Sequence, residues 1–282
     1  MINLHQELVM LARNTQSHVQ SSSDYQLLNK KLSKVIASAY NTTSTPTFLL
    51  TDNITFSLPY YDMGNINTTH LFGIDELIIL SFYLKNKNNY KNVLDLGANI
   101  GLHSIVLSLL DYQVTCFEAD PETFRVLKQN LELNNCKKIK PINEAAASFD
   151  GKAEFTRVCE NLTGSHLSGA KSNPYGELDK FEVKVNNIGN IAKEFDLIKI
   201  DIEGQEADVL TSISSEDALK IDFMMEINGE KNAKTIFDYS LQVGLNIFLQ
   251  KNDWKKVNSL AELPLSHREG SVFLSSKNKM PW

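Results

Sequence analysis

The stretch VLDLGANIG, residues 93–101, decides the fold class of this 282-residue chain. An apolar run leads into Gly97, and Gly101 follows four positions later, which predicts a buried strand, a tight turn and the start of a helix. The dinucleotide-binding fingerprint G-x-G-x-x-G is not met, because Asn99 takes the place of its second glycine and Leu102 that of its third. The turn therefore favours a ligand other than a pyrophosphate.

Downstream of this turn the chain alternates between short apolar runs and helical patterns. Strands are predicted at 92–96, 114–117, 139–143, 196–200, 221–227, 245–249 and 271–274, and helices at 74–83, 102–110, 121–133, 206–213 and 233–241. This alternation predicts βαβ units and an α/β fold with a doubly wound, mostly parallel, Rossmann-like sheet. Ligands of such sheets bind beyond the carboxyl ends of the strands, so we expect the functional residues there.

The first part of the chain has a different character. Residues 1–45 are polar with apolar residues at helical spacing, and Asp24 is predicted to cap the second helical run. Residues 46–70 carry short alternating stretches that predict a hairpin. We therefore divide the chain into an N-terminal extension, residues 1–70, and a main domain, residues 71–282. The extension is expected to serve as a lid, a dimer arm or a docking element for a protein partner.

Composition restricts the classes of protein that the chain can belong to. The net charge of −6 argues against a protein that grips nucleic acid through its bulk charge. The three cysteines form no C-x-x-C pair, which indicates free thiols and a reducing compartment. The first residues do not read as a signal peptide, and the richest apolar stretch, 71–84, is too short to span a bilayer. These features predict a cytoplasmic protein without a transmembrane segment or a nucleic-acid partner.

Acidic residues stand at the ends of the first two predicted strands. Asp95 lies beside the glycine turn, where it would repel a pyrophosphate and attract a cationic ligand. Glu118 ends the second strand, 23 positions after Asp95. A carboxylate at that place accepts the two ribose hydroxyls of an adenosine. The alternative for Glu118 is to cap the helix that begins at Pro121, but Asp120 suits that role better.

Further acidic residues follow two later strands. The segment DLIKIDIEGQE, residues 196–206, delivers Asp201 and Glu203 beyond its strand, and Glu226 and Asn228 follow the next one. Carboxylates that converge from adjacent strand ends can remove a proton from a substrate. The same oxygen atoms can instead hold Mg²⁺, which would lower the pKa of a bound hydroxyl. Both interpretations stay open at this point.

The strings DLGANIG, FEADP and IKIDIEGQE, in this order and spacing, resemble the FkbM-type family of S-adenosylmethionine-dependent methyltransferases over residues 74–275. The resemblance implies a class I methyltransferase fold with S-adenosyl-L-methionine as the cofactor. The resemblance assigns cofactor binding to Asp95, Gly97, Asn99, Gly101 and Glu118. It also assigns this role to Asn143, because Asn143-Glu144-Ala145 resembles the family's third-strand segment. The acid that the family usually carries before Gly151 is Ser148 in this chain.

The resemblance also points to O-methylation of a hydroxyl on a sugar of a glycan or on a natural product. Methyl transfer from a sulfonium needs an aligned nucleophile, a dry site and, for a hydroxyl, a base. Asp201, Glu203 and Glu226 are the candidate catalytic residues. Histidines are weaker candidates, since His103 is expected to be a helix residue and His166 lies in the segment 161–169, which is expected to lie over the crevice.

Two other classes of function remain alternatives. The chain could be a non-catalytic cofactor-binding or assembly module that docks a glycan-biosynthesis partner through residues 1–70. It could also be an NAD-linked oxidoreductase, which the missing glycines disfavour. Asn173-Pro174-Tyr175 resembles, with one proline missing, the N-P-P-Y signature of amino-group DNA methyltransferases, and we interpret it as a turn.

Overall fold

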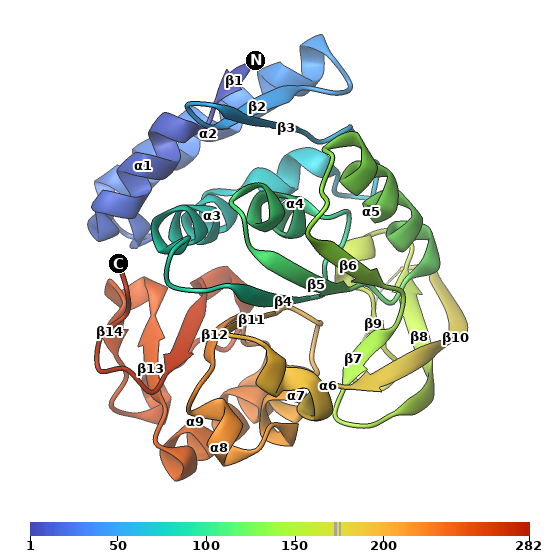
Figure 1. The fold of residues 1–282 in the computed structure, drawn as a ribbon, viewed down its shortest axis with the longest axis vertical. Coiled ribbons are helices and arrows are strands. Elements are labelled where there is room, and N and C mark those ends of the chain that lie inside the picture. The colour runs from blue at the N-terminus through green and yellow to red at the C-terminus, as the bar shows by residue number, and fades with distance from the viewer. Residues whose placement is uncertain (172–173, 175) are drawn as a thin grey trace.

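The computed structural model describes residues 1–171, 174 and 176–282, so Asn173 and Tyr175 of the predicted turn lie outside the described residues. An eight-stranded sheet forms its centre, with the order β14-β13-β15-β12-β11-β4-β5-β6 (Figure 1). Its strands are β4 (Asn92–Leu96), β5 (Gln113–Phe117), β6 (Ile139–Ile142), β11 (Leu197–Ile200), β12 (Asp222–Met225), β13 (Asn246–Leu249), β14 (Lys255–Lys256) and β15 (Val272–Ser275).

The strand directions confirm the predicted doubly wound, mostly parallel α/β fold. β6, β5, β4, β11 and β12 are mutually parallel, and β15 runs antiparallel between β12 and β13. The chain starts in the middle at β4, builds outward to β6, and then returns to β11 on the other side of β4. The strand order therefore reverses between β4 and β11, and a ligand crevice is expected at the carboxyl ends of these two strands.

Helices cover both faces of this sheet (Figure 1). One face carries α3 (Ile74–Asn86), α4 (Leu102–Leu109) and α5 (Pro121–Leu133), and the other carries α6 (Ile188–Ile191), α7 (Glu206–Ser212), α8 (Ser215–Ala218) and α9 (Glu230–Val243). Most of α3 is buried, because the sheet lies on one side of it and the N-terminal extension on the other. A helix covered on both sides can be apolar nearly all round, which is the composition that α3 has.

The extension is a layer of its own above α3 and α4 (Figure 1). It consists of β1 (Ile2–Asn3), α1 (His5–Arg13), η1 (Thr15–His18), α2 (Ser23–Thr42), β2 (Thr47–Thr51), β3 (Ile54–Ser57) and η2 (Thr68–Phe72). The predicted hairpin is present, since β2 pairs antiparallel with β3. The predicted cap is wrong: Ser22 Oγ accepts the Tyr25 N–H at 3.1 Å, and Asp24 lies in the first turn. α2 begins two residues earlier than the acidic cap would require.

A second sheet, which the sequence did not predict, lies beside β6 (Figure 1). Its strands, in spatial order, are β7 (Ala145–Ala147), β10 (Leu178–Asn187), β8 (Gly151–Val158) and β9 (His166–Leu167), with η3 (Leu162–Gly164) between β8 and β9. Charged side chains pair across β8 and β10, as Lys152 does with Glu182 at 2.5 Å and Lys180 with Glu154 at 2.9 Å. Such surface strands expose their polar face, so their apolar signal is weak.

A buried histidine ties the extension to the last strands of the main sheet. His18 is fully buried, its Nε2 donates to the Leu11 carbonyl at 2.9 Å, and its Nδ1 accepts the indole N–H of Trp254 at 2.8 Å. This arrangement uses the neutral ring, and burial lowers the pKa of His18 to about 4. No helix in the described part of the chain is long and apolar enough to cross a bilayer.

We expect His18 to make the fold sensitive to acid. Its pKa is lower in the folded chain than the ordinary 6.5, so the unfolded state binds the proton first as the pH falls. A shift of this size removes about 3 kcal/mol from the free energy of unfolding between neutral pH and pH 4. Urea unfolding at neutral pH and at acid pH should therefore show a smaller loss in His18→Gln than in the wild type, whereas His5→Gln should lose as much as the wild type. Equal losses in His18→Gln and the wild type would contradict the assignment.

Candidate active site

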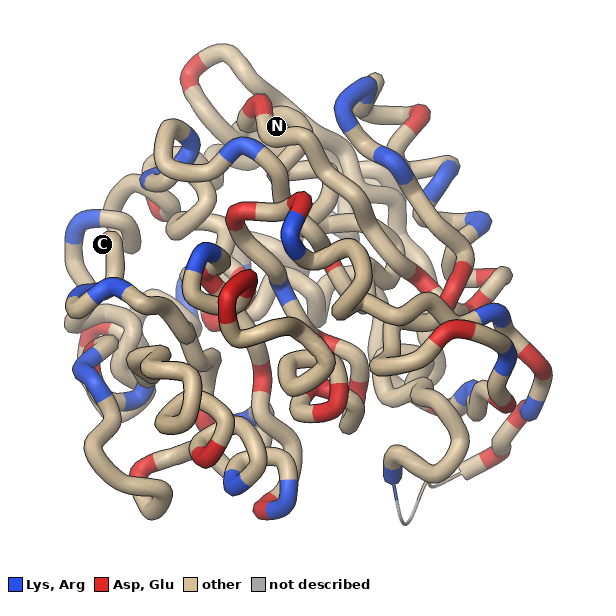
Figure 2. The backbone as a smooth tube through the Cα atoms, turned by 60° about the horizontal axis from the view of Figure 1, so that its bottom comes forward, with Lys and Arg blue, Asp and Glu red and all other residues tan. Residues whose placement is uncertain are grey.

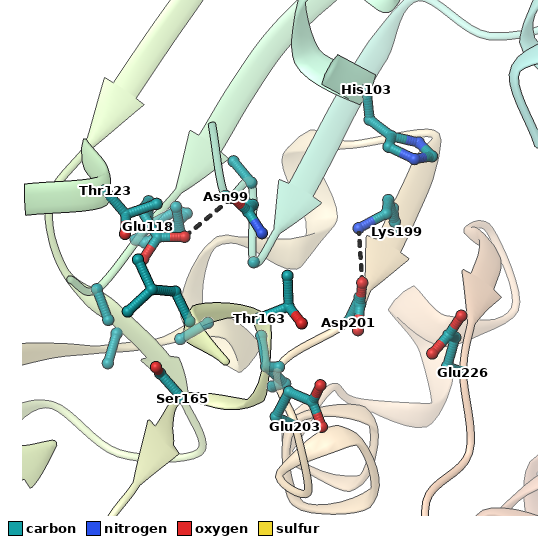
Figure 3. Close-up of a pocket in the computed structure, with 18 of the residues that line it drawn as sticks. Asn99, His103, Glu118, Thr123, Thr163, Ser165, Lys199, Asp201, Glu203 and Glu226 are labelled. Atoms are coloured by element: carbon teal, nitrogen blue, oxygen red, sulfur yellow. Dashed lines mark hydrogen bonds and ion pairs between the residues drawn. The ribbon is translucent and has the colours of Figure 1, made fainter. Parts of the chain in front are cut away.

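A pocket of about 340 Å³ lies at the carboxyl ends of β4, β5, β11 and β12. It has two ends (Figure 3): Asn99 and Glu118 lie at one, and Lys199, Asp201 and Glu226 lie at the other. This is the crevice that the reversal of strand order predicts. Each end is built by loops that directly follow the central strands.

The glycine turn after β4 packs against the backbone that follows β11. Gly97 has φ +80°, and a Cβ added to it would lie 1.8 Å from the carbonyl oxygen of Asp201. Asn99 follows with φ +51°, a left-handed conformation that asparagine tolerates, and its Oδ1 accepts the Ile100 N–H at 2.6 Å. Asparagine thus serves where the dinucleotide fingerprint has glycine. Gly101 lies behind the turn, where an added Cβ would lie 2.5 Å from Leu127 of α5.

Glu118 is held by backbone donors from both sides. Its Oε2 accepts the Asn99 N–H and its Oε1 accepts the Asp120 N–H, each at 2.9 Å. Each carboxylate oxygen can accept a further hydrogen bond, and Glu118 lines the pocket. Asn143 supports this turn from outside, since its Nδ2 donates to the carbonyls of Glu118 at 2.9 Å and Ala119 at 3.1 Å. The contact of Asn143 is therefore with the backbone that carries Glu118.

The pKa of Glu118 implies pH-dependent binding at this end of the pocket. Burial raises that pKa to about 7, with the charge of Asp120 as a smaller contribution. A ligand with two hydroxyl donors binds the ionised carboxylate better, so its affinity falls as the pH drops below this value. For S-adenosylhomocysteine we expect about tenfold weaker binding at pH 6 than at pH 8, measured by calorimetry. Glu118→Gln should bind weakly with no such pH dependence, and an equally steep decline in this variant would contradict the assignment.

Arg157 of β8 links the second sheet to the turn that carries Glu118. Its Nε donates to Asp120 Oδ2 at 2.6 Å and its Nη2 donates to Asp120 Oδ1 at 2.8 Å. Asp120 also caps α5, because its Oδ1 accepts the Glu122 N–H at 2.8 Å. This confirms that Asp120, rather than Glu118, caps the helix. A bidentate pair fixes geometry as well as charge, so the second sheet stabilises the loop beside the pocket.

A buried lysine lies among carboxylates at the other end. Lys199 Nζ is 3.5 Å from Asp95 Oδ1 and 3.4 Å from Asp201 Oδ2. Burial alone would lower the pKa of Lys199, but the charges of Asp201 and Asp95 outweigh it and raise that pKa above its ordinary value. Asp95 is itself fully buried, and its Oδ2 accepts the hydroxyl of Ser104 at 2.6 Å. The structure therefore places Asp95 in an ion pair with Lys199 rather than on the pocket surface.

The three predicted catalytic carboxylates all line the pocket. Asp201 pairs with Lys199, and Glu203 pairs with Lys171 at 2.5 Å. Glu203 has φ +58°, a conformation that costs a glutamate about 1 kcal/mol and is found mainly at functional sites. Burial, followed by the charge of Asp201, raises the pKa of Glu203. The same two causes raise the pKa of Glu226 well above its ordinary value, which favours its protonated form.

Several residues that line the pocket were not predicted from the sequence. Glu76 of α3 is one, and it lies beside Asp75 in the first turn of that helix, where acidic residues are common for helix-dipole reasons alone. His103 lines the pocket beside Glu76. His166 is buried within the second sheet, where its Nδ1 lies 2.9 Å from the Gly164 carbonyl. Further wall residues come from the stretch 66–71 and from the segment 161–167: Ile66, His70, Leu71, Asn161, Leu162, Thr163, Ser165 and Leu167.

The carboxylates predicted as Mg²⁺ ligands after β11 form ion pairs with lysines rather than converging on one point. The ammonium of Lys199 lies beside Asp201, and Glu203 is paired with Lys171. Over the described ranges, with their gaps at 172–173 and 175, no group of three or more His, Cys, Asp and Glu side chains converges in a way that could hold a metal ion. The charge of these carboxylates is thus balanced in part by ammonium groups of the chain itself.

Comparisons with known proteins agree with the geometry. The profile of the methyltransferase FkbM domain matches residues 95–255. "Methyltransferase 1" of Beauveria bassiana (strain ARSEF 2860) is 25% identical over 190 residues, which cover 57% of this chain and 75% of that protein. "Methyltransferase sdnD" of Sordaria araneosa is 25% identical over 209 residues, which cover 62% of this chain and 78% of that protein.

Solved structures with a similar arrangement have low TM-scores. The S-adenosylhomocysteine-bound methyltransferase PaMTH1 of Podospora anserina has a TM-score of 0.39 and 10% identity, over 71% of this chain and 78% of that one. A SAM-dependent methyltransferase of Agrobacterium tumefaciens has a TM-score of 0.41 and 12% identity, over 82% of this chain and 69% of that one.

The pocket residues fit an S-adenosylmethionine cofactor. Glu118 offers acceptor oxygens for ribose hydroxyls, and the far end carries more carboxylates than ammonium groups, which suits a sulfonium cation. The family profile spans more than half of the chain and includes the residues at both ends of the pocket. The chain therefore belongs to the FkbM-type methyltransferase family and is an S-adenosylmethionine-dependent methyltransferase.

Proposed function

We propose that the protein methylates a hydroxyl oxygen on a sugar, a glycan or a natural product. The observation that carries this proposal is the end of the pocket opposite Glu118, where Glu76, Asp201, Glu203 and Glu226 all face the cavity. Carboxylates accept hydrogen bonds from hydroxyl groups, so this end suits a neutral, hydroxyl-rich acceptor. An anionic acceptor would be repelled by the same groups.

Different residues of the chain have different roles in an in-line methyl transfer. S-adenosylmethionine supplies the methyl group on a positively charged sulfur. Glu118 holds the nucleoside part, and the apolar side chains of Ile66, Leu71 and Leu162 exclude water. Asp201, paired with Lys199, orients the acceptor, and a carboxylate at this end takes the hydroxyl proton. Alignment lowers such a barrier by up to about 7–11 kcal/mol, and a base adds roughly 10²–10⁴-fold in rate.

Two measurements test the proposal. Calorimetric titration should show micromolar binding of S-adenosylhomocysteine and no binding of NAD⁺. Methyl-labelled S-adenosylmethionine should then transfer its label to oxygen in a panel of methyl glycosides and phenols, but not to matched amines and thiols. Glu118→Ala should weaken binding of S-adenosylhomocysteine by about 1–3 kcal/mol. Labelled nitrogen or sulfur would contradict O-methylation, and preferential binding of NAD⁺ would revive the oxidoreductase alternative.

We also propose that residues 1–70 act on the acceptor side of the pocket. Ile66 and His70 line it, and the Leu162 N–H donates to the Met63 carbonyl at 3.1 Å, which joins the extension to the opposite wall. A partner protein that binds only when residues 1–70 are present would support the docking role instead. For nucleic acid we expect no binding, since Figure 2 shows Lys and Arg interspersed with Asp and Glu over the face that it displays.

A further inference from the structure

Three side chains of α3 and α4 form a hydrogen-bonded chain at the end of the pocket opposite Glu118, which we call the acceptor end. Glu76 Oε2 lies 2.7 Å from His103 Nε2, and His103 Nδ1 lies 3.1 Å from the hydroxyl of Tyr83. Tyr83 is fully buried, and burial raises its pKa well above the ordinary value, so its hydroxyl stays protonated and donates to Nδ1. His103 then donates from Nε2 to Glu76, a tautomer that we infer from this network. Glu76 lies before the segment that matches the family.

Glu76 presents an ionised carboxylate to the pocket. Burial alone would raise its pKa, but the hydrogen bond from His103, together with the charge of Lys199, outweighs burial and lowers that pKa. The other charged or titratable groups that interact with it electrostatically are Asp75 and Tyr83 on α3 and Glu226 after β12. The side chain of Glu76 is 29% exposed, and among the described residues none donates a hydrogen bond to its Oε1. This oxygen is available to a ligand.

The other carboxyl groups at this end have an ammonium partner or a strongly raised pKa. Asp201 pairs with Lys199, and Glu203 pairs with Lys171. Burial and the charge of Asp201 raise the pKa of Glu226, which favours its protonated form. A base must be ionised and must have a lone pair free for the incoming proton. Glu76 meets both conditions through Oε1, and the partner of its Oε2 is the imidazole of His103 rather than an ammonium group.

We propose that Glu76 is the catalytic residue that takes the proton of the acceptor hydroxyl, and that His103 is the residue that positions it; this inference rests on the O-methylation proposed above. The acceptor oxygen forms its bond to the methyl carbon while the bond from that carbon to sulfur breaks. The electron pair of the broken bond stays on sulfur, which becomes a neutral thioether. The hydroxyl proton moves to Oε1 of Glu76 and later leaves to solvent.

The first test compares variants of Glu76 in the full chain, with the hydroxyl panel described above as acceptors. Glu76→Gln should bind S-adenosylhomocysteine within about twofold of the wild type, but lose roughly 10²–10⁴-fold in the rate of label transfer. Glu76→Asp keeps the carboxylate and should recover part of that rate. Glu216→Gln is the matched control, because Glu216 is an exposed residue of α8 paired with Lys220, and this variant should behave as the wild type.

The second test separates positioning from packing at His103. In His103→Asn the group that most lowers the pKa of Glu76 is gone, and burial then raises that pKa. The acid limb of the profile of kcat/KM against pH should therefore move to higher pH. A histidine that only supports packing would lower the rate equally at every pH, and that result would overturn the role of His103.

The outcomes distinguish this proposal from the one on which it rests. Label transfer to hydroxyls by the wild type and equally fast transfer by Glu76→Gln would overturn the role of Glu76 alone. A loss of S-adenosylhomocysteine affinity in parallel with rate would place Glu76 in cofactor binding and also overturn it. A wild type that binds S-adenosylhomocysteine but labels none of the hydroxyls would overturn O-methylation and this assignment together.

Discussion

Gly97→Ala is expected to abolish binding of S-adenosylhomocysteine and to lower the free energy of unfolding by roughly 2–4 kcal/mol. The added methyl group would lie 1.8 Å from the carbonyl oxygen of Asp201 and 2.9 Å from its carbonyl carbon. Both atoms belong to the backbone after β11, so they cannot move aside as a flexible side chain would. The turns after β4 and β11 would have to separate, and both contribute residues to the pocket.

Urea unfolding and calorimetry measure the two parts of this effect. Gly244→Ala is the matched control, because Gly244 has φ +91° at the end of α9 and an added Cβ there meets nothing within 4 Å. That variant carries the left-handed strain alone, about 1 kcal/mol. If Gly97→Ala lost no more stability than Gly244→Ala and kept its affinity, the close packing of the two turns would not matter for the site.

Lys199→Met should be the most destabilising of the charge substitutions in the pocket. Lys199 is buried, and its removal leaves Asp95, which is fully buried, without its counter-charge. Breaking a buried ion pair from one side costs about 3–5 kcal/mol. The double variant Asp95→Asn/Lys199→Met should recover much of this loss, because the isolated buried charge is then gone.

A double-mutant cycle in urea tests this coupling. The losses of Asp95→Asn and Lys199→Met should not add, and the double variant should be more stable than Lys199→Met alone. Lys220→Met is the control on the surface, where Lys220 pairs with the exposed Glu216 and the loss should stay within about 0.5 kcal/mol. Additive losses at Asp95 and Lys199 would show that the two charges do not depend on each other.

The central sheet could be predicted from the sequence because its signals are local. β4 and α5 begin and end as predicted, since the apolar run stops at Gly97 and the Asp120-Pro121 pair starts the helix. The second sheet has no such signal. Its strands β8 and β10 carry charged residues whose partners lie about 30 positions away in sequence, as Lys152 and Glu182 do. Only the folded chain brings such a pair together.

The site was predictable where topology alone determines proximity. Parallel strands place their carboxyl ends at one edge, so Glu118, Asp201 and Glu226 could be grouped before the structure was known. Lys199 could not be placed, because a lysine within an apolar strand has no local explanation. The position of Lys199 is explained by the register of β11 against β4, which places Lys199 opposite Asp95. Glu76 reaches the pocket from a helix rather than from a strand end.

The unequal charge at the acceptor end of the pocket has a consequence for turnover. Glu76, Asp201 and Glu203 share this end with Lys199 and Lys171, and Asp95 lies buried beside them. Carboxylates in excess attract a sulfonium cation, whereas the neutral thioether left after transfer feels no such attraction. The reaction thus removes the charge by which one end of the pocket holds its cosubstrate. We expect S-adenosylhomocysteine to bind more weakly than S-adenosylmethionine, so that fresh cofactor displaces spent cofactor at each cycle.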